Sequence, residues 1–184
     1  MKKIIIISLL ILSSIRLAYF TTISLEHNIP KISIILFLHK IALIESNDDF
    51  SKVSKNGMLG KYQFKWSTAL IHLKKLGLNI TRQEFLNNYI IQNRVMMMNL
   101  KLNEKILHKY IVKYSNKIID GVLITKAGIL AGSQFGVGRV IEFFDKKGKF
   151  DLYDANGVHI KEYMRLFSKI QLPDPDLFFH SLYP

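Results

Sequence analysis

The hydrophobic pattern of the chain is one of helical segments separated by short polar turns. Residues 32–45 hold an almost unbroken apolar run that ends at Glu45, long enough for about four turns of helix. Because this run is apolar nearly all round, we expect a helix that is buried rather than lying on the surface. Strand-like alternation is rare elsewhere, so the pattern predicts a mainly α protein.

Turn and cap signals divide the rest of the chain. The segment 46–63 is rich in Asn, Asp and Gly and predicts a loop. Thr81 and Glu84 have the spacing of a capping box and predict the start of a long helical tract that reaches about Tyr114, with a break near 99–103. Shorter helices are expected at 67–76, 125–135, 138–145 and 159–167, with turns at 120–121 and 154–157.

The start of the chain differs from the rest. Lys2 and Lys3 precede an apolar stretch from Ile4 to Leu12, which has the composition of an export signal and is shorter than the ~20 residues of a membrane span. We expect a signal peptide or N-terminal anchor (1–20), a connector (21–31), one main domain (32–170) and a C-terminal tail (171–184). The expected location is extracytoplasmic, periplasmic or secreted, with membrane anchoring through the N-terminus if the segment is not cleaved.

Charge and cysteine content narrow the chemistry and the partners. The chain has 26 Lys and Arg against 14 Asp and Glu, and its net charge of +12 favours polyanions such as nucleic acid, acidic cell-wall polymer or anionic membrane. No nucleic-acid recognition motif accompanies the scattered basic residues, so we do not expect nucleic-acid binding. The absence of cysteine excludes disulfides and thiol chemistry. Histidine spacing does not fit a zinc site and residues 154–157 do not fit a calcium loop, so we predict neither metal nor cofactor.

Glu45 is the first candidate for catalysis. It comes at the C-terminal end of the predicted first helix, where burial and the negative end of the helix dipole both disfavour the charged form of a carboxyl group. A carboxyl group that keeps its proton is what a general acid needs. A glutamate after an apolar helix is usually just a polar helix end. The case for a catalytic role of Glu45 therefore depends on the sequence that follows it.

Two blocks of sequence support that candidate. Glu45-Ser46 is followed by Ser54, Gly57, Gly60, Gln63 and Thr68, and the second block is Leu130-Ala131-Gly132-Ser133-Gln134-Phe135-Gly136-Val137-Gly138-Arg139-Val140. Together they resemble the two motifs of soluble lytic transglycosylases and the related goose-type lysozymes. The segment from Asp154 to Gly157, with Tyr163 and Phe167 after it, is similar to the tail of certain peptidoglycan hydrolases of this superfamily. The likeness covers about residues 41–170.

The resemblance implies a lysozyme-like single domain with a substrate cleft and peptidoglycan as the partner. It implies an enzyme that cuts the bond between N-acetylmuramic acid and N-acetylglucosamine, with Glu45 as general acid and base. In that family the glutamate works alone and draws the sugar's own 6-hydroxyl onto the anomeric carbon, which leaves a 1,6-anhydro end. Hydrolysis by water is the alternative route. An apolar environment around a carboxyl group is also how lysozyme keeps its acid protonated.

The predicted substrate-binding residues are those whose chemistry suits a sugar: Ser46, Gly60, Tyr62, Gln63 and Gln134. A glycine allows close approach of the backbone, an amide can both donate and accept hydrogen bonds, and a tyrosine ring can stack on a sugar face. Simpler roles compete with these. A serine here can bond to the adjacent backbone, the glycines can be ordinary turn residues, and Trp66 is expected in the core rather than as a sugar platform.

Two positions depart from the family's second motif. Ser133 stands where the family usually has Tyr, and Gln134 stands where it usually has Asn. The family's tyrosine helps to position the catalytic group or the sugar, and a serine cannot reach as far. The second hypothesis is therefore a catalytically inactive glycan-binding or structural cell-wall module on the same fold. Asp48 and Asp49 are the carboxylates nearest to Glu45 in sequence, and their place in or out of the cleft bears on the reaction type.

Overall fold

The structure is a computed structural model that describes residues 32–149, 153 and 157–172. The predicted signal or anchor, the connector and nearly all of the C-terminal tail lie outside the described residues. Within the described part the chain is mainly α, as the hydrophobic pattern predicts, with one small two-stranded sheet. None of the described helices combines the length and the apolar character that crossing a membrane requires.

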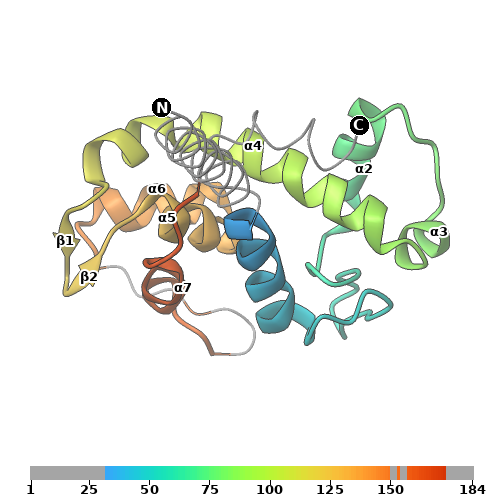
Figure 1. Cartoon of the computed structure of the whole chain (residues 1–184), viewed down its shortest axis with the longest axis horizontal. Helices are drawn as coiled ribbons and strands as arrows, with labels where there is room; N and C mark the ends of the chain where they lie inside the picture. Colours follow the sequence, from blue (N-terminus) through green and yellow to red (C-terminus); the bar gives the residue numbers. More distant parts are fainter. Residues whose placement is uncertain (1–31, 150–152, 154–156, 173–184) are drawn as a thin grey trace, which may run out of the picture.

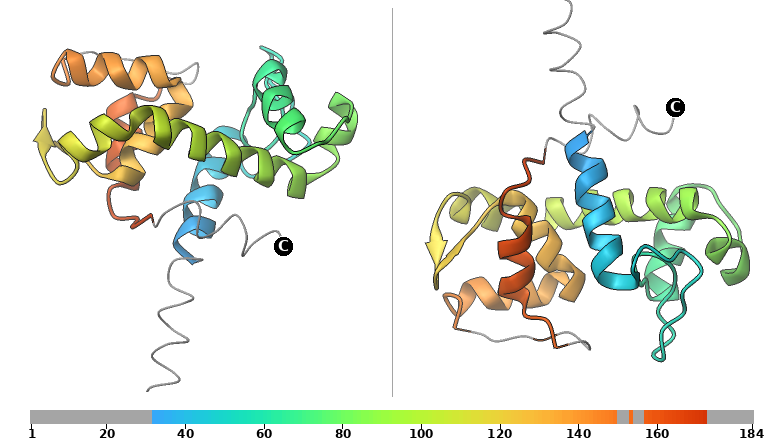
Figure 2. Two further views of the ribbon diagram at one scale, coloured as in Figure 1. Left: turned by 90° about the horizontal axis from the view of Figure 1, so that it is seen from above. Right: turned by 60° about the horizontal axis from the view of Figure 1, so that its bottom comes forward.

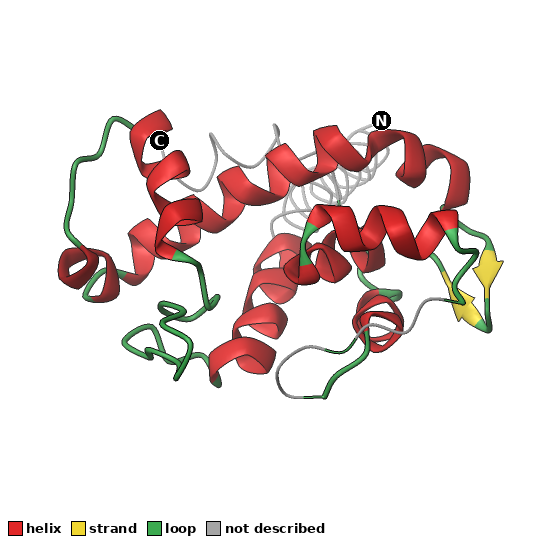
Figure 3. Ribbon diagram, turned by 180° about the vertical axis from the view of Figure 1, so that it is seen from behind, coloured by secondary structure: helices red, strands yellow, loops and turns green. Residues whose placement is uncertain are grey.

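Short connections join the helices in order along the chain. The first described helix occupies residues 32–46. It is followed by α2 (Trp66–Lys75), α3 (Arg82–Leu86), α4 (Tyr89–Tyr114), β1 (Ile118–Ile119), β2 (Val122–Leu123), α5 (Lys126–Gly132), the 3-10 helix η1 (Ser133–Phe135), α6 (Val137–Asp145) and α7 (Ile160–Phe167). α4 runs along the length of the molecule, with α2 and α3 at one end and the two strands at the other (Figure 1, Figure 3).

The 32–46 helix is buried on one face only. Phe37 and Ile41 are fully buried, whereas Ile35 and Leu36 are 48% and 54% exposed. The apolar run thus predicts the helix correctly and its burial wrongly, because an aliphatic sequence on both faces does not show which face meets the core. The buried face lies beside α7, where the rings of Phe37 and Phe167 meet with a centroid distance of 5.0 Å (Figure 2).

The helical tract that begins at Thr81 is two helices, and the predicted break near 99–103 is wrong. The capping box is confirmed: Thr81 Oγ1 accepts from the Glu84 N–H at 3.2 Å, and Glu84 Oε2 accepts from the Thr81 N–H at 2.7 Å. α3 ends after five residues, and α4 then runs without a break for 26 residues. The break lies at Asn88 because its side chain accepts from the Ile91 N–H at 3.1 Å and so starts a new helix.

The small sheet is a feature that the hydrophobic pattern does not predict. β1 and β2 are antiparallel and have two residues each, which is too short for alternation to show. The turn between them is the one that the sequence predicts. Asp120 and Gly121 both have positive φ, 48° and 72°, as a tight hairpin turn requires.

The close packing of α5 against α7 joins the two parts of the core. Tyr163 and Phe167 of α7 belong to one hydrophobic cluster, and Ile160 and Met164 belong to the other. The helices approach closely because α5 has Gly128 at the contact, where a Cβ atom would meet the Met164 carbonyl oxygen at 2.8 Å. The other predicted helices are present with small shifts at their ends, and the predicted helix 125–135 divides into α5 and η1. This packing holds α7 beside the end of the 32–46 helix.

Candidate active site

A groove opens where the 32–46 helix ends. It has a volume of about 490 Å³ and is bounded by the end of that helix, the loop 47–64, η1 and α7. A second hollow of about 410 Å³ adjoins it on the side of α2 and α4. The two share five lining residues, Met58, Tyr62, Gln63, Gln134 and Phe135. We therefore treat them as one continuous groove, the 45–134 groove.

Glu45 lies in the last turn of the 32–46 helix, half-buried, and lines the 45–134 groove. The chain leaves the helix one residue later, after Ser46. Asn47 and Asp48 both have positive φ, 61° and 62°, a conformation that Asn and Asp adopt more readily than most residues. The Asp48 N–H donates to the Ala42 carbonyl oxygen at 3.0 Å and closes the turn. Glu45 therefore stands where a rigid helix meets the loop that forms the opposite wall.

Tyr163 of α7 donates a hydrogen bond from its hydroxyl to Glu45 Oε1 at 2.9 Å. The tyrosine is 1% exposed, and its ring packs edge-on against Phe135 and nearly parallel to Phe167. Because the ring is held on both sides, its hydroxyl orients the Glu45 carboxyl group. Sequence reasoning did not select Tyr163 as a site residue because 118 positions separate it from Glu45. The signal that could have found it is the position of Tyr163 in the segment that the sequence analysis compared with the tail of peptidoglycan hydrolases.

Two predicted amide side chains, Gln63 and Gln134, line both parts of the groove. Gln63 has a positive φ of 49°, and its Nε2 donates to the Gly60 carbonyl oxygen at 2.8 Å. Gln134 Nε2 is buried and has no hydrogen-bond partner among the described residues. A buried donor without a partner costs about 1–3 kcal/mol.

Tyr62 also lines the groove, but as part of its wall. It is only 2% exposed, and its hydroxyl donates to Asn93 Oδ1 at 2.7 Å. This leaves too little ring surface for stacking on a sugar. Trp66 does not line the groove, and it packs against Phe85 with a centroid distance of 5.9 Å. Trp66 is half-buried and packs against the hydrophobic core, outside the groove.

Ser46 and Gly60, both predicted to contact a sugar, do not line the groove. Ser46 is buried, and its Oγ lies within hydrogen-bond distance of two carbonyl oxygens, 3.1 Å from that of Ala42 and 2.9 Å from that of Lys61. A Cβ at Gly60 would lie 2.3 Å from Gln92 Oε1, so the absent side chain makes room for a neighbour within the protein and not for a ligand. We correct both assignments: these residues hold the loop in place.

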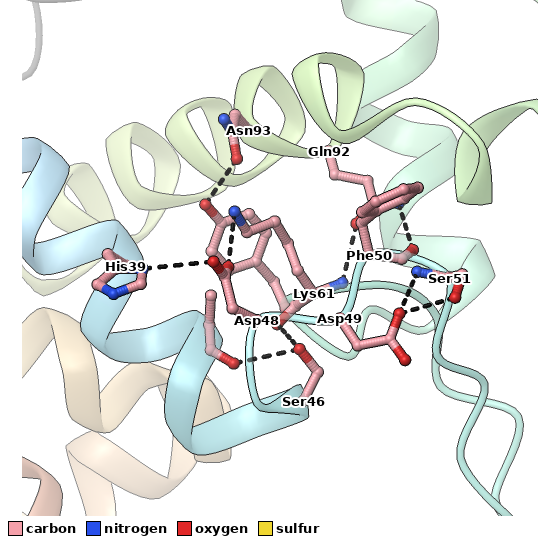
Figure 4. Close-up of polar contacts among 11 residues, drawn as sticks. His39, Ser46, Asp48, Asp49, Phe50, Ser51, Lys61, Gln92 and Asn93 are labelled. Carbon is pink, nitrogen blue, oxygen red and sulfur yellow. Dashed lines mark hydrogen bonds and ion pairs between the residues drawn. The ribbon is translucent and has the colours of Figure 1, made fainter.

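Gln92 is the residue that ties this loop to the helices. It is fully buried on α4, and its Oε1 accepts from the Lys61 N–H at 2.8 Å (Figure 4). Its Nε2 donates to the carbonyl oxygens of Phe50 and Phe85, each at 2.9 Å. One side chain thereby anchors both ends of the loop. Sequence reasoning missed Gln92 because a polar residue within a helical segment gives no local sign of its partners.

Glu45 is the only carboxylate among the described residues that line the groove. Asp48 pairs with Lys61 at 2.8 Å, outside the groove lining (Figure 4). Asp49 is exposed and accepts hydrogen bonds from Ser51, whose hydroxyl and N–H lower the pKa of this aspartate. Neither aspartate is therefore placed to act as a second carboxylate facing Glu45.

Comparison with known proteins finds no match to this chain, whether with family models, with curated proteins or with solved structures.

The rest of the groove lining mixes apolar side chains, such as Leu43, Met58 and Val158, with polar ones. Around Glu45 it includes Asn47, Lys52, Ser54 and Asn56, and in the adjoining hollow it includes Lys65, Thr68, Asn99, Asn103 and Ser133. The described residues hold no group of three or more acidic or histidine side chains arranged around a metal ion. Such a groove suits a ligand that offers hydroxyl and amide groups together with apolar surface. The oriented carboxyl group of Glu45 could exchange a proton with an oxygen of that ligand.

Proposed function

We propose that this protein cleaves the glycan strands of peptidoglycan between N-acetylmuramic acid and N-acetylglucosamine, on a lysozyme-like fold with Glu45 as general acid and base. The observation that carries the proposal is the hydrogen bond from Tyr163 to Glu45 inside a groove whose lining includes amide and hydroxyl side chains beside apolar ones. Amino-sugar polymers offer the hydroxyl and acetamido groups that such a lining can bind. The resemblance of both sequence blocks to lytic transglycosylases and goose-type lysozymes supports the same reaction.

The absence of a second carboxylate beside Glu45 in the described lining favours the route through a 1,6-anhydro ring over hydrolysis by water. Glycosidases with two carboxylates place them about 5–9.5 Å apart, and Glu45 has no such partner among the described lining residues. Glu45 first protonates the glycosidic oxygen as the bond to the anomeric carbon breaks. It then accepts the proton of the sugar's own 6-hydroxyl, which attacks that carbon and closes a 1,6-anhydro ring. Attack by water, which leaves a reducing end, is the alternative outcome at the same site.

Peptidoglycan lies outside the cytoplasm, so the proposal requires export. The basic and apolar start of the chain, residues 1–20, is the segment expected to direct that export. The proposal therefore joins an extracytoplasmic location to the chemistry of the groove.

A catalytically inactive glycan-binding module is the second candidate, and Ser133 favours it. The Ser133 hydroxyl is buried, accepts from Asn103 Nδ2 at 2.9 Å and donates to the Leu130 carbonyl oxygen at 2.6 Å. It therefore does not take the place of the tyrosine that the family usually has at this position. A protein of this kind would bind the glycan through Gln63 and Gln134 without turnover.

The test compares the wild type with Glu45→Gln and with Glu162→Gln as a matched control. Glu162 is also on the protein surface, but it pairs with Arg165 and does not line the groove. We expect the wild type and the control to solubilise isolated sacculi. A general acid accelerates bond cleavage by about 10²–10⁴-fold. Glu45→Gln should therefore release fragments at least about 100-fold more slowly while still binding the sacculi.

Each outcome separates the candidates. Equal release by Glu45→Gln and wild type would refute the acid role. Binding without release by all three proteins would favour the inactive module. Mass spectrometry of released fragments then distinguishes 1,6-anhydro ends from reducing ends.

A further inference from the structure

The outward side of α4 carries a row of lysines. Lys101, Lys105, Lys109 and Lys113 follow one another at intervals of four residues, and all four are exposed. Residues four apart lie on the same side of a helix, so the row is about 18 Å long at 1.5 Å per residue. We call these four residues, with the exposed Val112 among them, the α4 lysine face.

Acidic side chains nearby are engaged elsewhere. Glu104, the acidic residue of α4, pairs with Lys126 of α5 at 2.6 Å. Asp120, in the turn that follows α4, pairs with Lys161 of α7. Like charges at this spacing destabilise a helix by a few tenths of a kcal/mol per pair. Lys109 and Lys113 lie over the rings of Tyr110 and Tyr114, contacts that leave their positive charge available to an anionic partner.

Two aliphatic side chains distinguish between the anionic partners. Val112, within the α4 lysine face, is 70% exposed, and Ile118, in β1 just after α4, is 73% exposed. These are the most exposed large hydrophobic side chains among the described residues. A lipid bilayer accepts aliphatic tips at its headgroup boundary while lysines reach the phosphates. A single-stranded nucleic acid is bound instead by aromatic stacking, and a soluble polyanion offers nothing to aliphatic side chains.

We propose that the α4 lysine face, together with Ile118, docks on the surface of an anionic lipid bilayer. This contact is separate from any insertion of residues 1–20 and does not depend on the proposed activity. In Figure 1 α4 lies along the upper part of the molecule, and the loop 47–64 and α7 lie below it. The groove meets α4 at Asn99 and Asn103, each two residues before a lysine of the face and therefore about 200° away around the helix. Docking through the α4 lysine face would leave the 45–134 groove open to a polymer in the surrounding space.

The experiment compares two triple variants of the full chain with equal charge. The face variant is Lys105→Gln/Lys109→Gln/Lys113→Gln. The control variant, Lys55→Gln/Lys74→Gln/Lys75→Gln, changes three exposed lysines elsewhere. Each variant lowers the net charge from +12 by three, to +9. Binding is measured by co-sedimentation with phosphatidylcholine vesicles that contain or lack phosphatidylglycerol. Each lysine near an anionic surface raises the binding constant by about fivefold. We therefore expect the face variant to bind anionic vesicles on the order of 100-fold more weakly and the control to bind much as the wild type does.

Two further variants and a soluble polyanion distinguish the alternatives. A Lys105→Arg/Lys109→Arg/Lys113→Arg variant should retain binding, and Val112→Ser should weaken the binding that persists at high salt. Equal weakening by the two glutamine variants would overturn the proposal, because net charge alone would then explain binding. Unchanged binding by the face variant would also overturn it, in favour of the N-terminal segment. Loss of binding to soluble polyphosphate but not to vesicles would identify a polymer site instead.

Discussion

At Glu45, the orientation of the carboxyl group depends on a partner from the last described helix. The helix end places the carboxyl group at the groove, but a glutamate side chain has three rotatable bonds and needs a contact to hold one orientation. Tyr163 supplies that contact through a hydroxyl whose ring is fixed between Phe135 and Phe167. The position of the Glu45 carboxyl group therefore depends on ring packing as well as on the helix that carries it.

Tyr163→Phe tests this positioning role. The substitution keeps the ring and its packing and removes only the hydroxyl, so the Glu45 carboxyl group gains freedom to rotate. If the protein cleaves peptidoglycan as proposed, we expect fragment release to fall by about 10- to 100-fold, with binding to sacculi and the thermal midpoint close to those of the wild type.

The matched control is Tyr89→Phe, which removes a hydroxyl from an exposed ring at the start of α4. It should release fragments at the wild-type rate. Equal rates for Tyr163→Phe and Tyr89→Phe would show that the hydrogen bond to Glu45 has no part in the reaction.

Residues that act through near neighbours in sequence are the ones that sequence reasoning could find. Glu45, Gln63 and Gln134 were selected because each belongs to a short motif, and all three line the groove. Tyr163 and Gln92 were not selected, because their partners lie 118 and 31 positions away. No local pattern encodes a contact at such a separation, so these two required the folded chain.

At the scale of elements, the loop 47–64 has two glycines that look alike in sequence and differ in surroundings. Gly57 and Gly60 have the same positive φ of 72°, but a Cβ at Gly57 would meet nothing within 4 Å, whereas one at Gly60 would collide with Gln92. The backbone conformation alone costs an alanine about 1–2 kcal/mol at either position. Only Gly60→Ala would also displace the side chain that anchors the loop.

We therefore expect Gly60→Ala to lower the free energy of unfolding by about 1–3 kcal/mol more than Gly57→Ala, since Gln92 would lose buried hydrogen bonds. The measurement is urea unfolding followed by the fluorescence of Trp66, the only tryptophan of the chain. Equal losses for the two variants would contradict the role of Gly60 in making room for Gln92.

Helices with a strong local signal were the elements that the sequence predicted well. The capping box at Thr81 and the turn at Asp120 are confirmed because their side chains or φ values act within a few residues. The break at Asn88 was misplaced because the apolar pattern continues on both sides of it. The exposed side of the 32–46 helix was also missed, since which face is buried depends on where α7 packs.

For the whole molecule, the groove depends on segments that the sequence does not bring together. Its walls come from the end of the 32–46 helix, the loop 47–64, η1 and α7. A mainly α class follows from the spacing of apolar residues, but the mutual placement of these helices follows from contacts such as that of Gly128 with Met164. The sequence thus predicted the class and the first residues of the site, and not the shape of the groove.

The pKa shifts of the described groups all act on the stability of the whole molecule in one direction. Burial lowers the pKa of His72, so the unfolded chain accepts a proton below about pH 6.5 before the folded protein does. Hydrogen bonds lower the pKa of Glu84, Asp120 and Glu142, so the unfolded chain again accepts protons first, below about pH 4. By linkage, stability falls with falling pH in both ranges, and His72 dominates the upper one.

The His72→Gln variant tests how much His72 contributes to the loss of stability below about pH 6.5. The glutamine amide can still donate to Asn99 Oδ1, which His72 Nε2 contacts at 3.2 Å, but it does not titrate. The urea midpoint of the wild type should fall between about pH 7.5 and about pH 5, and that of His72→Gln should fall less, because the unfolded chain no longer gains this proton. His108→Gln, a change at an exposed histidine of α4, should behave as the wild type does. An equal fall for His72→Gln and the wild type would mean that the acid sensitivity of the fold comes from its carboxylates alone.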